Sequence, residues 1–140
     1  RDVEVQVRFS RNVADVQLST GIVDIVEGSE EFTDKAGLRG DWGRACAGNN
    51  PKVYDTITVG LGVYVPKQYY KADSHFTDGK ERLPNQAYVQ VVGTDTDNLH
   101  YWFNATCDIE TFGFSGKEAW FDYLKKWKKE LDNPAVITIN

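Results

Sequence analysis

The stretch Val3-Glu4-Val5-Gln6-Val7-Arg8-Phe9 carries the most regular pattern in the chain. Apolar and polar residues alternate over its whole length, as in a β-strand with one face buried and one face in water. The segment 99–107 repeats this alternation, with one face that ends in Cys107 and a second face that carries Asn104. Two strands of this kind predict a protein built mainly from antiparallel β-sheet.

The other segments extend this prediction. Residues rich in Val, Ile, Tyr or Thr, set between turn residues, predict further strands. These strands are expected over 14–18, 22–26, 53–65, 87–92 and 136–139. Gly60 and Gly62, inside one of them, indicate a bulge or the close approach of another backbone.

One amphipathic helix is predicted near the end of the chain. Apolar side chains recur there at helical spacing, at Trp120, Leu124, Trp127 and Leu131, and place the helix over 116–131. The predicted fold is mainly β (α+β), an antiparallel β-sandwich or open barrel of about seven strands with this helix packed on it. We expect a single globular domain over residues 1–140.

Composition and charge exclude several classes of protein. The chain has 140 residues, of which 41% are hydrophobic and 26% charged, as in a protein with an ordinary core. The net charge of −5 argues against nucleic-acid binding, because phosphate contacts need clustered Lys and Arg. A solvated helix face explains the lysine-rich segment 125–129 better than a nucleic-acid or acidic membrane surface does. No apolar run has the length of a membrane span.

Three features favour a secreted, extracellular protein. The chain begins at Arg1 and lacks methionine, which predicts a mature chain whose leader has been removed. Cys46 and Cys107 permit one internal disulfide, for which two buried free thiols are the alternative. Asn104-Ala105-Thr106 is an acceptor for N-glycosylation, which takes place in the secretory pathway. We therefore expect a disulfide-linked glycoprotein.

The segment 28–52 has the least regular pattern. A short helical turn is expected over 30–36, and the glycines that follow predict a loop over 35–50. This loop contains Arg39-Gly40-Asp41, followed by Trp42. The tripeptide resembles the adhesive loops of disintegrin-type and matrix proteins, and such a loop also occurs on the β-sandwich of some small secreted fungal toxins. The resemblance covers three to four residues. It implies that the Arg and Asp side chains enter a receptor cleft and contact its metal ion.

We expect from this loop a secreted binding protein or effector-like toxin that contacts a protein or a cell-surface receptor. Loops 35–50 and 66–85 are the expected contact surface, because long irregular segments are often binding loops. The expected partner-binding residues are Arg39, Gly40, Asp41, Trp42, Tyr69 and Tyr70. Asp41→Glu is expected to weaken binding and to leave the fold intact.

Two other functions stay open. A small hydrolase would use Asp24, Asp55 or His75, because burial of a carboxyl group suits it to general acid catalysis. Turn hydrogen bonds and a strand end explain these residues better than catalysis does, and the chain has no GxSxG, HExxH or Walker A motif. A carbohydrate-binding domain would use exposed rings, with Trp42, Tyr69, Tyr70 and Trp102 as candidates. No cofactor or metal is expected, since turn chemistry explains the polar segment 95–98.

Overall fold

The structure is a computed structural model that describes residues 2–14, 16–25, 27–45, 52, 55–76, 86–93 and 96–136. Within these residues the chain forms eight strands and one helix. The strands are β1 (Asp2–Val13), β2 (Val16–Val23), β3 (Glu27–Thr33), β4 (Leu38–Ala45), β5 (Ile57–Tyr64), β6 (Tyr70–Phe76), β7 (Gln86–Gly93) and β8 (Thr96–Cys107), and the helix is α1 (Lys117–Asp132).

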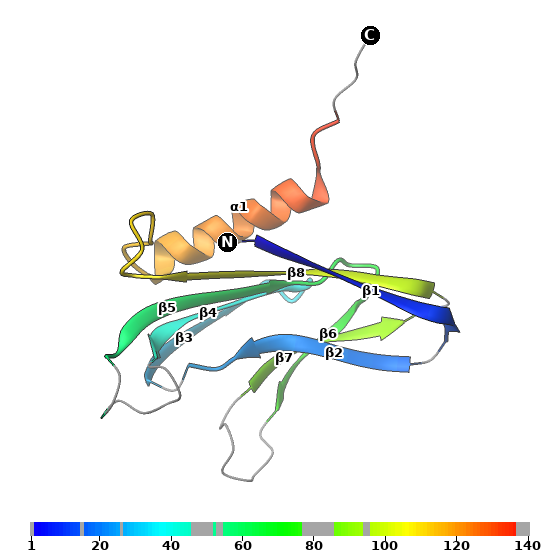
Figure 1. Ribbon diagram of the computed structural model, residues 1–140, viewed down its shortest axis with the longest axis horizontal. Helices are drawn as coiled ribbons and strands as arrows, with labels where there is room; N and C mark the ends of the chain where they lie inside the picture. The colour runs from blue at the N-terminus through cyan, green and yellow to red at the C-terminus, as the bar shows by residue number, and fades with distance from the viewer. Residues whose placement is uncertain are drawn as a thin grey trace.

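The strands form two antiparallel sheets. One has five strands in the order β1-β8-β5-β4-β3, and the other has three in the order β2-β7-β6. The helix α1 lies over one face of the five-stranded sheet, and the three-stranded sheet lies on the opposite side (Figure 1). The predicted mainly β fold with one C-terminal helix packed on it is therefore confirmed.

Strand β8, which lies between β1 and β5, explains why the molecule has three layers. Its odd-numbered residues face the three-stranded sheet, where Leu99 is buried among core side chains that include Val63 and Ile22. Its even-numbered residues face α1, where Trp102 packs in a second cluster around Trp120 and Leu124. Alternation along one strand therefore supplies two separate cores.

Glycines let the helix approach the five-stranded sheet closely. A Cβ on Gly62 would lie 2.6 Å from Cδ2 of Leu124, and one on Gly60 would lie 2.8 Å from Cε2 of Trp120. A Cβ on Gly40 would likewise lie 2.5 Å from Cδ1 of Leu124. The close approach predicted from the glycines of the strand is thus made by side chains of a helix.

The prediction of a loop over 35–50 is wrong for most of the described residues. Only residues 35–37 form a bend, with positive φ at Lys35 and Gly37, and the chain then continues as strand β4. Strand β3 replaces the helical turn expected over 30–36. The signal was misleading because Gly40 makes room for α1 and does not mark a turn.

Other element boundaries also differ from the prediction. The strand expected over 22–26 ends at Val23, and the described residues after it, 24 and 25, are not in a strand. Strand β6 occupies part of the loop expected over 66–85, of which residues 77–85 lie outside the described residues. The last expected strand also falls outside them, except for Val136, which is not in a strand.

Candidate functional site

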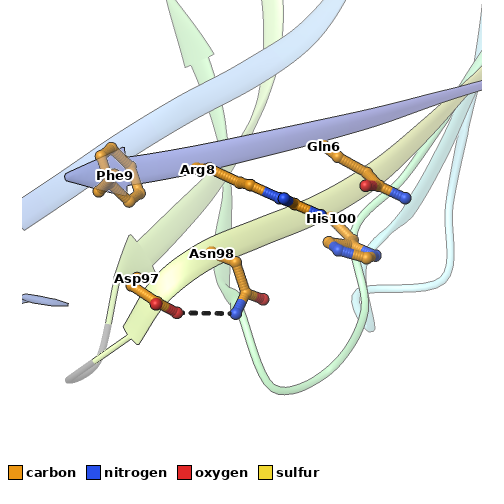
Figure 2. Close-up of a pocket in the computed structure, with 6 residues that line it drawn as sticks. All are labelled: Gln6, Arg8, Phe9, Asp97, Asn98 and His100. Atoms are coloured by element: carbon orange, nitrogen blue, oxygen red, sulfur yellow. Dashed lines mark hydrogen bonds between the residues drawn. The ribbon is translucent and has the colours of Figure 1, made fainter. Parts of the chain in front are cut away.

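An open cleft lies on the surface of strands β1 and β8, at the edge of the five-stranded sheet (Figure 2). Its volume is about 500 Å³. The lining residues are Gln6, Arg8, Phe9, Asp97, Asn98 and His100. Five of these six side chains are polar, so the cleft suits a hydrophilic ligand.

The register of the two strands brings the polar side chains together. Gln6 lies opposite His100, and Arg8 lies opposite Asn98. Directly opposite side chains in an antiparallel pair have Cβ atoms about 5 Å apart. The four side chains therefore form a compact group on the sheet face that carries α1.

A bulge in β1 shapes the far end of the cleft. The regular ladder ends at the pair Arg8–Asn98 and resumes only at Val13–Thr96. Between these pairs, residues 9–12 of β1 stand against Asp97 alone on β8. Extra residues of this kind bend a strand and turn its side chains in new directions. Phe9 and Asp97 lie outside the regular alternation of the two strands. The bulge explains why they nevertheless line the same cleft.

Trp102 connects the cleft to the helix-side core. Its ring centroid lies 6.4 Å from that of His100 in an edge-to-face arrangement. The same indole stacks on Tyr64, with centroids 5.9 Å apart, and Tyr64 contacts Trp127 of α1. One border of the cleft is therefore held by packed aromatic rings.

Hydrogen bonds already occupy several of the polar groups. Glu4 accepts a hydrogen bond of 3.0 Å from Gln6 Nε2, and its Oε1 lies 3.4 Å from Nδ1 of His100. Asp97 accepts a hydrogen bond of 3.0 Å from Asn98 Nδ2. Two donors remain. Within the described residues, neither the guanidinium of Arg8 nor Nε2 of His100 has a hydrogen-bond or ion-pair partner.

Arg39-Gly40-Asp41 lies inside the molecule, contrary to the prediction of an exposed adhesive loop. All three residues belong to β4, which is paired with β3 on one side and with β5 on the other. Arg39 is 6% exposed and forms an ion pair with Glu31, and Asp41 is 1% exposed. Side chains buried to this degree cannot enter a receptor cleft, so the tripeptide has a structural role.

Asp41 joins three segments by hydrogen bonds. Its Oδ2 accepts one of 2.8 Å from the backbone N–H of Ile25, and its Oδ1 accepts 2.8 Å bonds from Trp42 N–H and from the hydroxyl of Ser29. Ser29 Oγ also lies 3.0 Å from Oδ1 of Asp24. Burial raises the pKa of Asp41, with the negative charge of Asp24 adding to the effect, and the hydrogen bonds only partly oppose this shift.

Two of the candidate catalytic residues, Asp24 and Asp55, do not come together. Asp24 is buried and lies near Asp41, which is opposite Leu61 on β5. Asp55 is exposed and precedes the start of β5, six residues along the chain from Leu61, or about 20 Å at strand spacing. The side chain of His75 lies outside the described residues. The structure thus gives no support to a shared catalytic site for Asp24 and Asp55.

The expected aromatic platform is also absent from the described surface. Tyr69 is buried in the core between the sheets, and Tyr70 packs against the same core. Trp42 and Trp102 are partly buried against the helix-side core. Of these four rings, only Trp102 contacts a residue of the cleft.

Asn104 is buried, although the sequence predicted it on a solvent face. It is 2% exposed, and its Nδ2 donates hydrogen bonds to Asp2 and to the hydroxyl of Tyr123 in α1. A glycan on this nitrogen would break both bonds and displace the helix. Asn104 lies on the face of β8 that points away from the three-stranded sheet. The prediction failed because α1 covers that face at Asn104.

Within the described residues, Cys107 carries a free thiol, and Cys46 lies outside them. Ala45, the last residue of β4, and Cys107 are paired with opposite sides of β5. The disulfide stays a prediction without structural support.

The sequence analysis did not identify the cleft residues as a site. Gln6 and Arg8 were recognised only as the polar face of a strand, and His100 as a solvent-facing residue. The available signal was the polar alternation of both strands, but it shows neither which strands pair nor their register. Without the pairing of β1 with β8, these residues have no common location.

No curated protein and no solved structure matches the chain. Within the described residues, no helix combines the length and apolar character of a membrane crossing. A family model does match almost the whole sequence, over residues 1–137. The chain therefore belongs to the family described as a domain of unknown function, DUF4861.

Proposed function

We propose that the chain is a carbohydrate-binding module whose cleft between β1 and β8 takes an acidic sugar. The observation that carries this proposal is the unoccupied guanidinium of Arg8, which lies in one open cleft with His100, whose Nε2 also has no partner within the described residues. A guanidinium presents its donors in a planar fork that matches a carboxylate.

The rest of the lining suits hydroxyl groups. Gln6 contributes an amide oxygen, and Asp97 contributes a carboxylate that accepts hydrogen bonds. The side chain of Arg8 extends toward the end of the cleft that holds Gln6 and His100, and Asp97 lies at the other end (Figure 2). The guanidinium of Arg8 can bind an anionic group at one end, and the oxygens of Gln6 and Asp97 can accept hydrogen bonds from hydroxyl groups along the cleft, which together suit a uronic acid.

The local charge argues against a ligand with more than one negative charge. Glu4 contacts His100 beside the cleft, and Asp97 lines it, so two carboxylates accompany the single guanidinium of Arg8. The chain as a whole carries a net charge of −5. Phosphate-rich ligands and nucleic acids would be repelled by this arrangement, whereas one carboxylate on an otherwise neutral sugar is compatible with it.

This proposal replaces protein binding through loops 35–50 and 66–85. Most residues on which that interpretation depended now have structural explanations, since Arg39, Asp41 and Tyr69 are buried. A secreted location remains a prediction, and it fits a ligand that occurs in extracellular polysaccharides.

The test is a comparison of matched sugars by NMR. Glucuronate and glucose differ by one carboxylate, and each is titrated into the isotope-labelled protein. The proposal expects glucuronate to shift the amide signals of β1 and β8 near the cleft, with little effect from glucose. Shifts from neither sugar, or shifts confined to residues far from the cleft, would contradict it.

A further inference from the structure

The five-stranded sheet has two edge strands, β1 and β3. An edge strand presents unpaired backbone N–H and C=O groups, and natural proteins protect such an edge with charges, bulges or prolines. Strand β3 has two of these protections. It carries Glu27, Glu30 and Glu31, and its pairing with β4 is irregular between Glu27 and Glu30.

Strand β1 has no bulge or proline over Asp2–Arg8. This stretch pairs with β8 without a break and contains no glycine. On its outer side it forms no backbone hydrogen bond with any other described segment. Val3, within the stretch, is 55% exposed. Asp2–Arg8 is therefore a free edge to which another strand can add.

The residues of this edge complement themselves when the strand is reversed. With two copies of β1 antiparallel and Gln6 opposite Gln6, Glu4 of each copy lies opposite Arg8 of the other. Val5 of each copy likewise lies opposite Val7 of the other. Opposite side chains in an antiparallel pair point to the same face, so ion pairs form on the face that carries α1 and apolar pairs form on the other face. The two-fold axis makes each of these contacts twice.

We propose that two copies of the chain associate through β1, in the register that places Gln6 opposite Gln6. The two five-stranded sheets then form one continuous antiparallel sheet. The charge order of β1 selects a second copy over an unrelated strand, since Glu4 and Arg8 each meet the opposite charge on the same segment of the partner. One strand edge makes a small interface, so we expect a weak dimer whose population rises with protein concentration.

Both charged groups are available for this pairing. Gln6 Nε2 and His100 Nδ1 contact Oε1 of Glu4, and within the described residues Oε2 has no hydrogen-bond or ion-pair partner. The guanidinium of Arg8 is also without a partner there. Because a guanidinium has five N–H donors, Arg8 can pair with Glu4 of the second copy and still donate to a ligand in the cleft.

Other registers fit the charges less well. A shift by one residue would place the charged face of one copy beside the apolar face of the other. A shift by two residues sets Asp2 opposite Arg8, but Oδ1 of Asp2 already accepts hydrogen bonds from Asn104 and Tyr123. The same shift in the other direction places Glu4 opposite a residue of the bulge, without a positive charge. The register through Gln6 is therefore the favoured one.

Sedimentation equilibrium of the chain, without any sugar, tests the dimer. Glu4→Arg or Arg8→Glu sets like charges opposite one another at two places and should weaken the dimer at least about tenfold. The double variant E4R/R8E exchanges the charges and should restore it. Arg44→Glu, at an exposed position on β4, is the control and should dimerise as wild type does. Circular dichroism of each variant confirms that it is folded.

Three outcomes would overturn the dimer or its register. A wild-type chain that stays monomeric at about 1 mM would exclude the dimer. A dimer that neither single variant weakens would assign the association to another surface. Single variants that weaken it without recovery in the double variant would exclude the register. Because no sugar is present, none of these outcomes decides whether the cleft binds glucuronate.

A cross-link tests the register without altering the charges. Opposite residues of an antiparallel pair have Cβ atoms about 5 Å apart, so Gln6→Cys should form a disulfide between the two copies under mild oxidation. Peptide mass mapping distinguishes a link between the two residues at position 6 from links to Cys46 or Cys107. Asp55→Cys, at an exposed position before β5, is the control and should not link to itself. Equal cross-linking of both variants would contradict the proposed pairing.

Discussion

The indole ring of Trp120 lies directly against Gly60, and a Cβ on that glycine would come within 2.8 Å of the indole Cε2. The ring is fully buried, and its Nε1 donates a hydrogen bond of 3.2 Å to the backbone oxygen of Leu61. The helix therefore packs on a part of the sheet where glycines leave room for its side chains. This contact joins α1 to β5 and gives the sandwich its third layer.

Gly60→Ala should weaken this contact without changing the fold. The added methyl meets Trp120 and also lies 2.9 Å from Trp42, and buried rings cannot move aside freely. Overpacking of this kind costs about 1–3 kcal/mol. Urea unfolding followed by tryptophan fluorescence measures the loss.

Gly116→Ala is the matched control for the glycine variant. The nearest atom to a Cβ at Gly116 is a side-chain oxygen of Glu118 at 3.6 Å, an ordinary contact. Any loss of stability should come only from the N-cap position of α1, where Ala is less favourable than Gly, and not from a clash. Equal midpoints for Gly60→Ala and wild type would show that α1 does not depend on the close approach.

Strands and helix were predictable where one pattern dominates. The alternation of residues 3–9 and the helical spacing from Trp120 to Leu131 were sufficient to predict β1 and α1. The β3–β4 hairpin was missed because its glycines and charges have tertiary causes. Gly40 accommodates Leu124, and Asp41 is buried by pairing with strands that are distant in sequence. A local pattern does not contain such causes.

Asp41→Glu should destabilise the protein, in contrast to the expectation from an adhesive loop. The added methylene moves the carboxylate away from Ile25 N–H and the Ser29 hydroxyl, in a site that is 1% exposed. We expect a loss of about 1–3 kcal/mol in urea unfolding. Asp55→Glu, at an exposed position, is the control and should be neutral. Wild-type stability in Asp41→Glu would show that these hydrogen bonds contribute little.

Asn104→Ala should lower stability, because Asn104 acts as a hydrogen-bond donor between β8, the start of β1 and α1. Removal of this buried amide loses both hydrogen bonds and the packing of the side chain, which costs about 1–3 kcal/mol. The folded wild-type protein from a secretory host should also have an unmodified mass at this residue. A natively folded form with a glycan on Asn104 would contradict the packing of α1 on β8.

Tyr64 should make stability fall at alkaline pH. Its hydroxyl donates to Asp132 at the end of α1, and burial first, then this bond and the negative charge of Asp132, raise its pKa. The folded protein therefore retains the phenolic proton above the ordinary tyrosine pKa of about 10. Its stabilising effect is complete below that pH and is lost as pH rises above it.

The difference between wild type and Tyr64→Phe measures this effect. At neutral pH the variant should be less stable by about 1 kcal/mol, the net value of one hydrogen bond. At about pH 11 the difference should shrink, since only wild type pays to keep a buried phenol protonated. Tyr101→Phe, whose ring packs against Phe103, is the control. A constant difference at both pH values would contradict a raised pKa.

The central claim is that the free guanidinium of Arg8 binds a carboxylate in the cleft. Calorimetric titration of glucuronate into wild type and Arg8→Gln tests it most directly, with Arg44→Gln, an exposed arginine of β4 that does not line the cleft, as the matched control. A charged hydrogen bond contributes about 1.5–3 kcal/mol, so Arg8→Gln should weaken binding by about 10- to 100-fold. Arg44→Gln should bind as wild type does. Equal affinities of wild type and Arg8→Gln for glucuronate would contradict the proposed function.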